Sequence, residues 1–113
     1  MTTDEFENPE AVIVRLRLSD DEFGEWEERE AAYAVEDRLI QAFEACDAGS
    51  VDGHEFGAGF ATIYVYGPSA DRMAAIVLAT VTGAQHRAGS FLIKRFGPPG
   101  AREQSVPLVE GAA

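Results

Sequence analysis

Apolar and polar residues alternate in the second half of residues 11–20, which is the pattern of a β-strand that buries one face. One side of this stretch carries the aliphatic residues Val12, Val14, Leu16 and Leu18, and the other carries Arg15 and Arg17. Residues 60–66 repeat the alternation, with Ala61, Ile63 and Val65 on one side and Phe60, Thr62, Tyr64 and Tyr66 on the other. The pattern therefore predicts two strands, each with an aliphatic face and a face of larger, more polar side chains.

Two other stretches have the spacing of helices. Between about residues 25 and 47, a 3-4-3-4 spacing joins a core stripe of Ala32, Val35, Leu39, Ala42 and Cys46. Ser19 and Glu22 have the S-x-x-E spacing of a capping box, so a short turn is expected before this helix. A second helix is expected over 69–83, with Ser69 as its N-cap and Gly83 at its end.

Three further strands complete the expected fold, at about 50–56, at 89–96 and at 102–108, where Pro107 restricts the last strand to a sheet edge. The resulting order, β-α-β-β-α-β with an additional C-terminal edge strand, resembles ferredoxin-like α+β domains over residues 11–97. This resemblance implies an antiparallel-rich sheet with both helices on one face. It implies no function, because that fold hosts enzymes, RNA binders, metal carriers and regulators.

The motif pattern DDEFG…DGHEFG…YGP…RFGPPGAR also resembles small uncharacterised bacterial proteins, and this resemblance implies no activity. Along 50–56, strict alternation places Asp52, His54 and Phe56 on one face and Val51, Gly53 and Glu55 on the other. His54 is therefore expected to be a partly exposed strand residue. Gly57 and Gly59 are expected to supply the positive φ of the following turn.

The length of 113 residues and the hydrophobic content of 46% predict a single domain at 11–109, between an acidic arm at 1–10 and a tail at 110–113. No apolar stretch reaches the roughly 18–20 residues that cross a bilayer, and the acidic start lacks the layout of a secretory signal. A cytoplasmic protein is therefore expected. Cys46, the single cysteine, is expected to be a buried and unreactive thiol.

A net charge of −11 changes the expected partners. Acidic surfaces repel the phosphates of nucleic acids and anionic membranes, so we expect neither as a partner. No metal-ligand spacing and no cofactor motif is present, so no cofactor and no metal are expected. A protein partner, either a second copy or another chain, is the expectation that remains.

The sheet face opposite the core is the favoured binding surface. It is predicted to contain Arg15, Arg17, Thr62, Tyr64 and Tyr66, together with Lys94, or Arg95 if the register of the fourth strand is the reverse. Tyrosine interleaved with arginine is typical of protein interfaces. The RNA-binding alternative lacks the RNP1 run that stacks bases. The sequence thus favours a small acidic binding protein that uses this face for homodimerisation or for a partner.

Two other surfaces remain as alternatives. In the expected topology, three connections meet at one end of the sheet and carry Asp20, Asp21, Glu22, His54, Glu55 and His86. Carboxylates beside histidine could bind a divalent ion or act as acid and base, which would make the protein an enzyme or a metal-dependent module. Separately, Trp26, Tyr33 and Ile40 recur every seven residues opposite the core stripe of the first helix, where they could form a partner surface.

Overall fold

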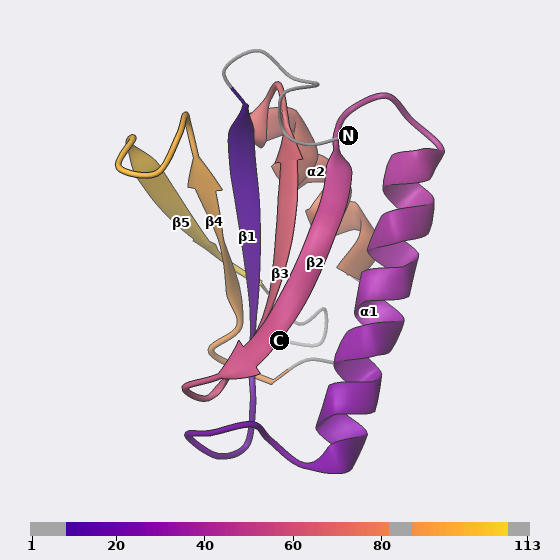
Figure 1. Cartoon of the computed structure of the whole chain (residues 1–113), viewed down its shortest axis with the longest axis vertical. Helices are drawn as coiled ribbons and strands as arrows, with labels where there is room; N and C mark the ends of the chain where they lie inside the picture. Colours follow the sequence, from indigo (N-terminus) through magenta and orange to yellow (C-terminus); the bar gives the residue numbers. More distant parts are fainter. Residues whose placement is uncertain (1–8, 82–86, 109–113) are drawn as a thin grey trace.

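The computed structural model describes residues 9–81 and 87–108, which form an α+β fold of two helices and an open antiparallel sheet of five strands. The strand order is β2-β3-β1-β4-β5, and Figure 1 shows α2 behind this sheet and α1 beside β2. The elements are β1 (Glu10–Arg17), α1 (Trp26–Glu44), β2 (Ser50–Gly57), β3 (Phe60–Gly67), α2 (Ala70–Val81), β4 (Phe91–Arg95) and β5 (Glu103–Pro107). As expected, β5 lies at an edge, where Pro107 interrupts no central ladder.

Strand register assigns each residue to one of the two faces of the sheet. We call the face that carries the core the first face and the opposite one the second face. Val14 of β1 lies between Ile63 of β3 and Leu92 of β4, and all three are almost fully buried. In α1, Glu36 pairs with His54, which lies opposite Ile63, and in α2, Asp71 pairs with Lys94, which lies opposite Val12.

The core stripe predicted for α1 is buried in its central part. Ala32, Val35 and Leu39 are buried, and Phe43 joins them in the core. The helix ends at Glu44, earlier than expected, so Cys46 lies beyond it, half-buried, with its thiol 3.4 Å from the Ala42 carbonyl oxygen. In α2 the buried residues are Ala70, Met73, Ala74, Val77 and Val81.

The start of α1 differs from the expected Ser19–Glu22 capping box. Glu25 is the N-cap, and its backbone N–H donates to Glu28 Oε1 at 2.8 Å. The Ser19 hydroxyl donates to the same carboxylate at 2.9 Å. The capping box is therefore formed by Glu25 and Glu28. Residues 19–24 lie before the helix, which begins at Trp26.

That turn is organised by Asp20. Its Oδ1 accepts hydrogen bonds from the backbone N–H groups of Glu22 and Gly24, both at 2.9 Å. These bonds, led by the one from Glu22, lower the pKa of Asp20, and the bond from the Glu25 backbone likewise lowers the pKa of Glu28. Folding therefore favours both ionised carboxylates, and this stabilisation is lost as the pH falls through their lowered pKa values.

The start of α2 agrees with the sequence, since Ser69 Oγ accepts a hydrogen bond from the Arg72 N–H at 3.1 Å. Glu10 adds a second contact, because its carboxylate accepts from the Ala70 N–H at 2.7 Å. Glu10 thus belongs to β1 rather than to the expected N-terminal arm. The rest of the arm up to Asn8, Gly83 and the tail 110–113 lie outside the described residues.

β2 departs from strict alternation. The register shifts between Val51 and Gly53, so Asp52 is the extra residue of a bulge. Val51 therefore shares the first face with His54 and Phe56, whereas the sequence placed it on the other face. In the turn after β2, positive φ occurs at Ala58 and Gly59 and not at Gly57, so that expectation was wrong for Gly57.

Candidate functional site

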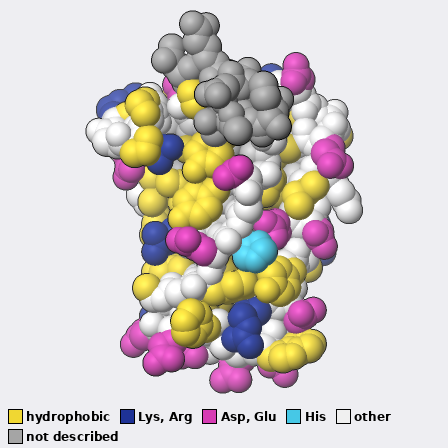
Figure 2. All heavy atoms as spheres, in the orientation of Figure 1, with side chains coloured by type: hydrophobic (Ala, Val, Ile, Leu, Met, Phe, Trp, Pro, Cys, Tyr) yellow, Lys and Arg dark blue, Asp and Glu magenta, His cyan; other side chains and the backbone are white. Residues whose placement is uncertain are grey.

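The second face of the sheet is the one opposite Val14, Ile63 and Leu92. By register its residues on β1 to β4 are Ala11, Ile13, Arg15, Arg17, Ser50, Gly53, Glu55, Gly57, Phe60, Thr62, Tyr64, Tyr66, Phe91, Ile93 and Arg95. Figure 2 shows hydrophobic side chains gathered over this side of the sheet, with charged side chains around them. The Phe60 and Phe91 rings meet edge to face with their centres 5.6 Å apart. This arrangement gives a largely apolar surface with a few fixed charges.

Arg15 occupies the middle of the second face. Its guanidinium carbon lies 4.6 Å from the centre of the Phe60 ring and 6.0 Å from that of Phe91, which are cation–π distances. Its Nε is buried and has no hydrogen-bond acceptor among residues 9–81 and 87–108. No carboxylate pairs with Arg15 within the same residues. An unsatisfied buried donor is uncommon in folded proteins, which sets this arginine apart from the other charged groups of the second face.

The other charged groups of the second face have partners. Arg17 donates to the Gly59 carbonyl oxygen and pairs with Asp21, both at 3.4 Å, so it is held at the end of the sheet. Glu55 accepts a hydrogen bond from the Tyr64 hydroxyl at 2.9 Å. Burial first, and then this carboxylate, raise the pKa of Tyr64, which stays protonated and remains a donor.

Lys94 is not on the second face. It lies opposite Val12 on the first face, and its ammonium group pairs with Asp71 of α2 at 2.9 Å. Arg95 lies opposite Ala11 on the second face instead, which is the reverse register that the sequence left open. The stretch Leu92-Ile93 is apolar on both sides of the strand, and therefore only pairing with β1 could decide between the two registers.

The predicted loop-end residues have separate partners where the structure describes them. His54 Nδ1 contacts Glu36 of α1 at 2.8 Å, while Glu55 points to Tyr64 on the opposite face. Asp20 and Asp21 are engaged within their own loop and with Arg17, and Glu22 is exposed there. His86 lies outside the described residues. Among the residues that the structure does describe, no group of three or more metal-ligating side chains occurs.

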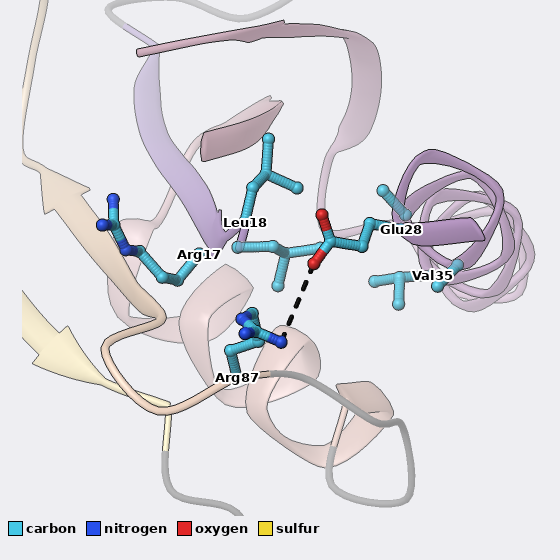
Figure 3. A pocket seen from close by; sticks show the side chains of 8 residues that line it. Arg17, Leu18, Glu28, Val35 and Arg87 are labelled. Carbon is cyan, nitrogen blue, oxygen red and sulfur yellow. Dashed lines mark ion pairs between the residues drawn. The ribbon is translucent and has the colours of Figure 1, made fainter. Parts of the chain in front are cut away.

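A small cavity lies on the helix side of the same end of the sheet. It measures about 80 Å³ and is lined by Leu16, Arg17, Leu18, Glu28, Ala31, Ala32, Val35 and Arg87. Figure 3 shows Arg87 reaching Glu28 at its edge, 3.7 Å apart, while the Arg17 guanidinium points away. Ligand sites are usually about 300–1,000 Å³. The cavity is therefore too small for a substrate of ordinary size.

The predicted partner surface on α1 is divided. Trp26 is 63% exposed, but Tyr33 packs edge to face against both His54 and Phe56, with ring centres 5.1 and 5.6 Å away. Ile40 is half-buried. Tyr33 nevertheless keeps 39% of its surface exposed, so Trp26 and Tyr33 are exposed and Ile40 is half-buried on this side of α1.

Sequence reasoning overlooked two residues of these sites. Phe91 shares the second face with Arg95, and the alternation of Phe91, Ile93 and Arg95 was the signal that could have placed it there. Glu36 is 9% exposed although it is charged, and it follows Val35 in the core stripe. Its role depends on His54, a residue of another strand, so no local pattern identifies it.

Comparison of the chain with protein family models, with curated proteins and with solved structures found no match. Among the described residues, neither helix has both the length and the apolar composition needed to cross a bilayer.

Proposed function

We propose that this protein is a binding module whose second sheet face associates with another protein surface, either a second copy or a different chain. We assign the architecture to the ferredoxin-like type, with both helices on the first face and β5 added beyond β4. The strand order β2-β3-β1-β4-β5 supports this assignment. So do the contacts of Glu36 and Asp71 with residues of the first face.

The observation that carries the proposal is the environment of Arg15. In a chain of net charge −11, Arg15 packs against two neighbouring phenylalanine rings on the second face. Its Nε is buried and has no hydrogen-bond acceptor among the described residues. Aromatic residues and arginine are the types most enriched at the energetic centres of protein interfaces. A partner would exclude water from the aromatic rings and supply the acceptor that Arg15 lacks.

Site-specific photo-crosslinking tests this proposal. Tyr66 is half-buried on the second face, and Tyr33 is an exposed tyrosine elsewhere that provides a matched control. Each is replaced, one at a time, by p-benzoyl-phenylalanine, and the irradiated cells are analysed for crosslinked protein. We expect adducts from position 66, to this chain or another, and none from position 33. Adducts from position 33 alone would move the binding surface to α1, and their absence from both positions would refute a binding role.

The same proposal predicts that nucleic acid is not the partner, because the chain is strongly acidic. The three arginines of the second face are set against twenty acidic residues in the whole chain, so phosphate repulsion outweighs base stacking on the aromatic rings. We therefore expect no salt-sensitive binding of single-stranded RNA or DNA in the micromolar range, measured by fluorescence anisotropy. Micromolar binding that weakens as salt rises would contradict this prediction.

A further inference from the structure

We propose that the partner on the second face is a second copy of this chain, related to the first by a two-fold axis that runs along β3 between the two facing sheets. This inference rests on the proposed binding role of the second face and names its occupant. An interface with two-fold symmetry must be complementary to itself. The second face is complementary to itself in both charge and shape when the two-fold axis runs along β3.

The register around β3 defines three rows across the second face. They are Ile13–Tyr64–Gly53, Arg15–Thr62–Glu55 and Arg17–Phe60–Gly57, each written from β1 through β3 to β2. Rotation about an axis along β3 keeps each row at its height and exchanges its two ends. In the dimer, β1 of one copy therefore lies over β2 of the other, and β3 lies over β3.

This rotation brings opposite charges together. Arg15 of each copy faces Glu55 of the other, so its Nε gains an acceptor that the described residues of its own chain do not supply. Glu55 is exposed and uses one oxygen, Oε2, for Tyr64, so its second oxygen remains available for Arg15. The two symmetric pairs lie beside Thr62, which is already buried at the middle of the row.

Shape follows the same pattern. A Cβ atom built at Gly53 or Gly57 would meet nothing within 4 Å, so the second face is shallow along β2. The side chains of β1, which include Ile13, are large at the matching positions. Rotation about β3 places Ile13 of one copy over Gly53 of the other. The two strands that flank β3 are therefore complementary in size as well as in charge.

Other occupants fit less well. An axis along β1 would place Arg15 over Arg15, and like charges facing each other oppose association. A different acidic protein would satisfy Arg15 but would bring its own negative charge against Glu55. Only a surface with both an acid and a base, in the spacing of row Arg15–Thr62–Glu55, satisfies both residues, and the chain itself has that surface.

Exchange of the two charges provides the test. We expect the wild-type protein to sediment at about twice its chain mass of 12.2 kDa. In a dimer of Arg15→Glu, each new glutamate faces Glu55 of the other copy. In a dimer of Glu55→Arg, each new arginine faces Arg15 of the other copy. Like charges therefore meet in both variants, and each substitution should weaken self-association at least tenfold. An equal mixture of the two variants forms only attractive pairs in the mixed dimer, because Glu at 15 meets Arg at 55 and Glu55 meets Arg15. The mixture should therefore regain the dimer mass.

The outcomes separate the parts of the proposal. A wild-type protein that remains a single chain at high concentration overturns the second copy, while crosslinks from position 66 to another chain would leave the binding role intact. Two single variants that both stay dimeric, or a mixture that stays monomeric, overturn the axis along β3. If Arg15→Glu does not fold, Gly57→Leu replaces it. That variant has room in the isolated chain but collides with β1 of the second copy, so it should be monomeric with an unchanged fold.

Discussion

Replacement of Tyr64 by glutamate is expected to abolish association through the second face and to leave the domain folded. Tyr64 lies on β3, the strand along which the proposed two-fold axis runs, so the glutamate that replaces it would have to lose its hydration in an apolar interface. It would also face Glu55, the present partner of the Tyr64 hydroxyl. A loss of about 2–4 kcal/mol of binding energy is typical of such a central position. Light scattering after size exclusion should show the mass of one chain.

Trp26→Glu is the matched control for this experiment. It places the same charge on an exposed aromatic position, 63% accessible, which lies at the start of α1 and away from the second face. We expect the control to keep the wild-type mass, and both variants to keep the wild-type circular dichroism. If Tyr64→Glu and wild-type protein had the same mass at every concentration, the second face would not be the interface.

Gly67→Ala is expected to have the largest effect on folding. Gly67 ends β3, and a Cβ atom there would lie 2.5 Å from the Ala48 carbonyl oxygen and 2.9 Å from the Gly49 Cα. Backbone atoms cannot turn aside as a flexible side chain can, so the methyl group must push β3 away from the chain that enters β2. Overpacking of this kind costs about 1–3 kcal/mol. Chemical denaturation followed by circular dichroism measures the loss.

Gly57→Ala provides the comparison. It adds the same methyl group to the same type of strand end, but its Cβ would meet nothing within 4 Å. We expect its free energy of unfolding in dilute solution to remain within about 0.5 kcal/mol of wild type, as for other surface substitutions. Equal effects from the two substitutions would show that close packing around Gly67 does not limit the stability of the sheet.

Local pattern was sufficient for much of the fold. Alternation in β1 and β3 assigned Arg15, Thr62 and Tyr64 to the face away from the core, and the register confirms that assignment. Helical spacing likewise identified Val35 and Leu39 as core residues of α1. These features follow from the period of 2 in strands and 3.6 in helices, which the backbone geometry imposes on any short stretch.

Local pattern failed where a strand carried an irregularity or was apolar on both sides. The bulge at Asp52 moved Val51 to the face of His54, and no residue in the sequence marks that insertion. In β4, Leu92 and Ile93 are both apolar, so the sequence chose Lys94 for the second face where the structure places Arg95. A shift of one residue in register moves every side chain of a strand to the other face of the sheet. The face of such positions therefore cannot be assigned without the neighbouring strand.

The sequence by itself determined the order of strands and helices, the central part of the buried stripe of α1, and that arginine and tyrosine share one side of the sheet. Only the tertiary structure decided which of them are neighbours. Arg15 contacts Phe60 and Phe91 because β1 lies between β3 and β4. It shares a row with Glu55 because β3 lies between β1 and β2. Periodicity is a property of the local backbone, whereas strand order and register result from burying distant segments together, so contacts across the sheet are absent from any local pattern.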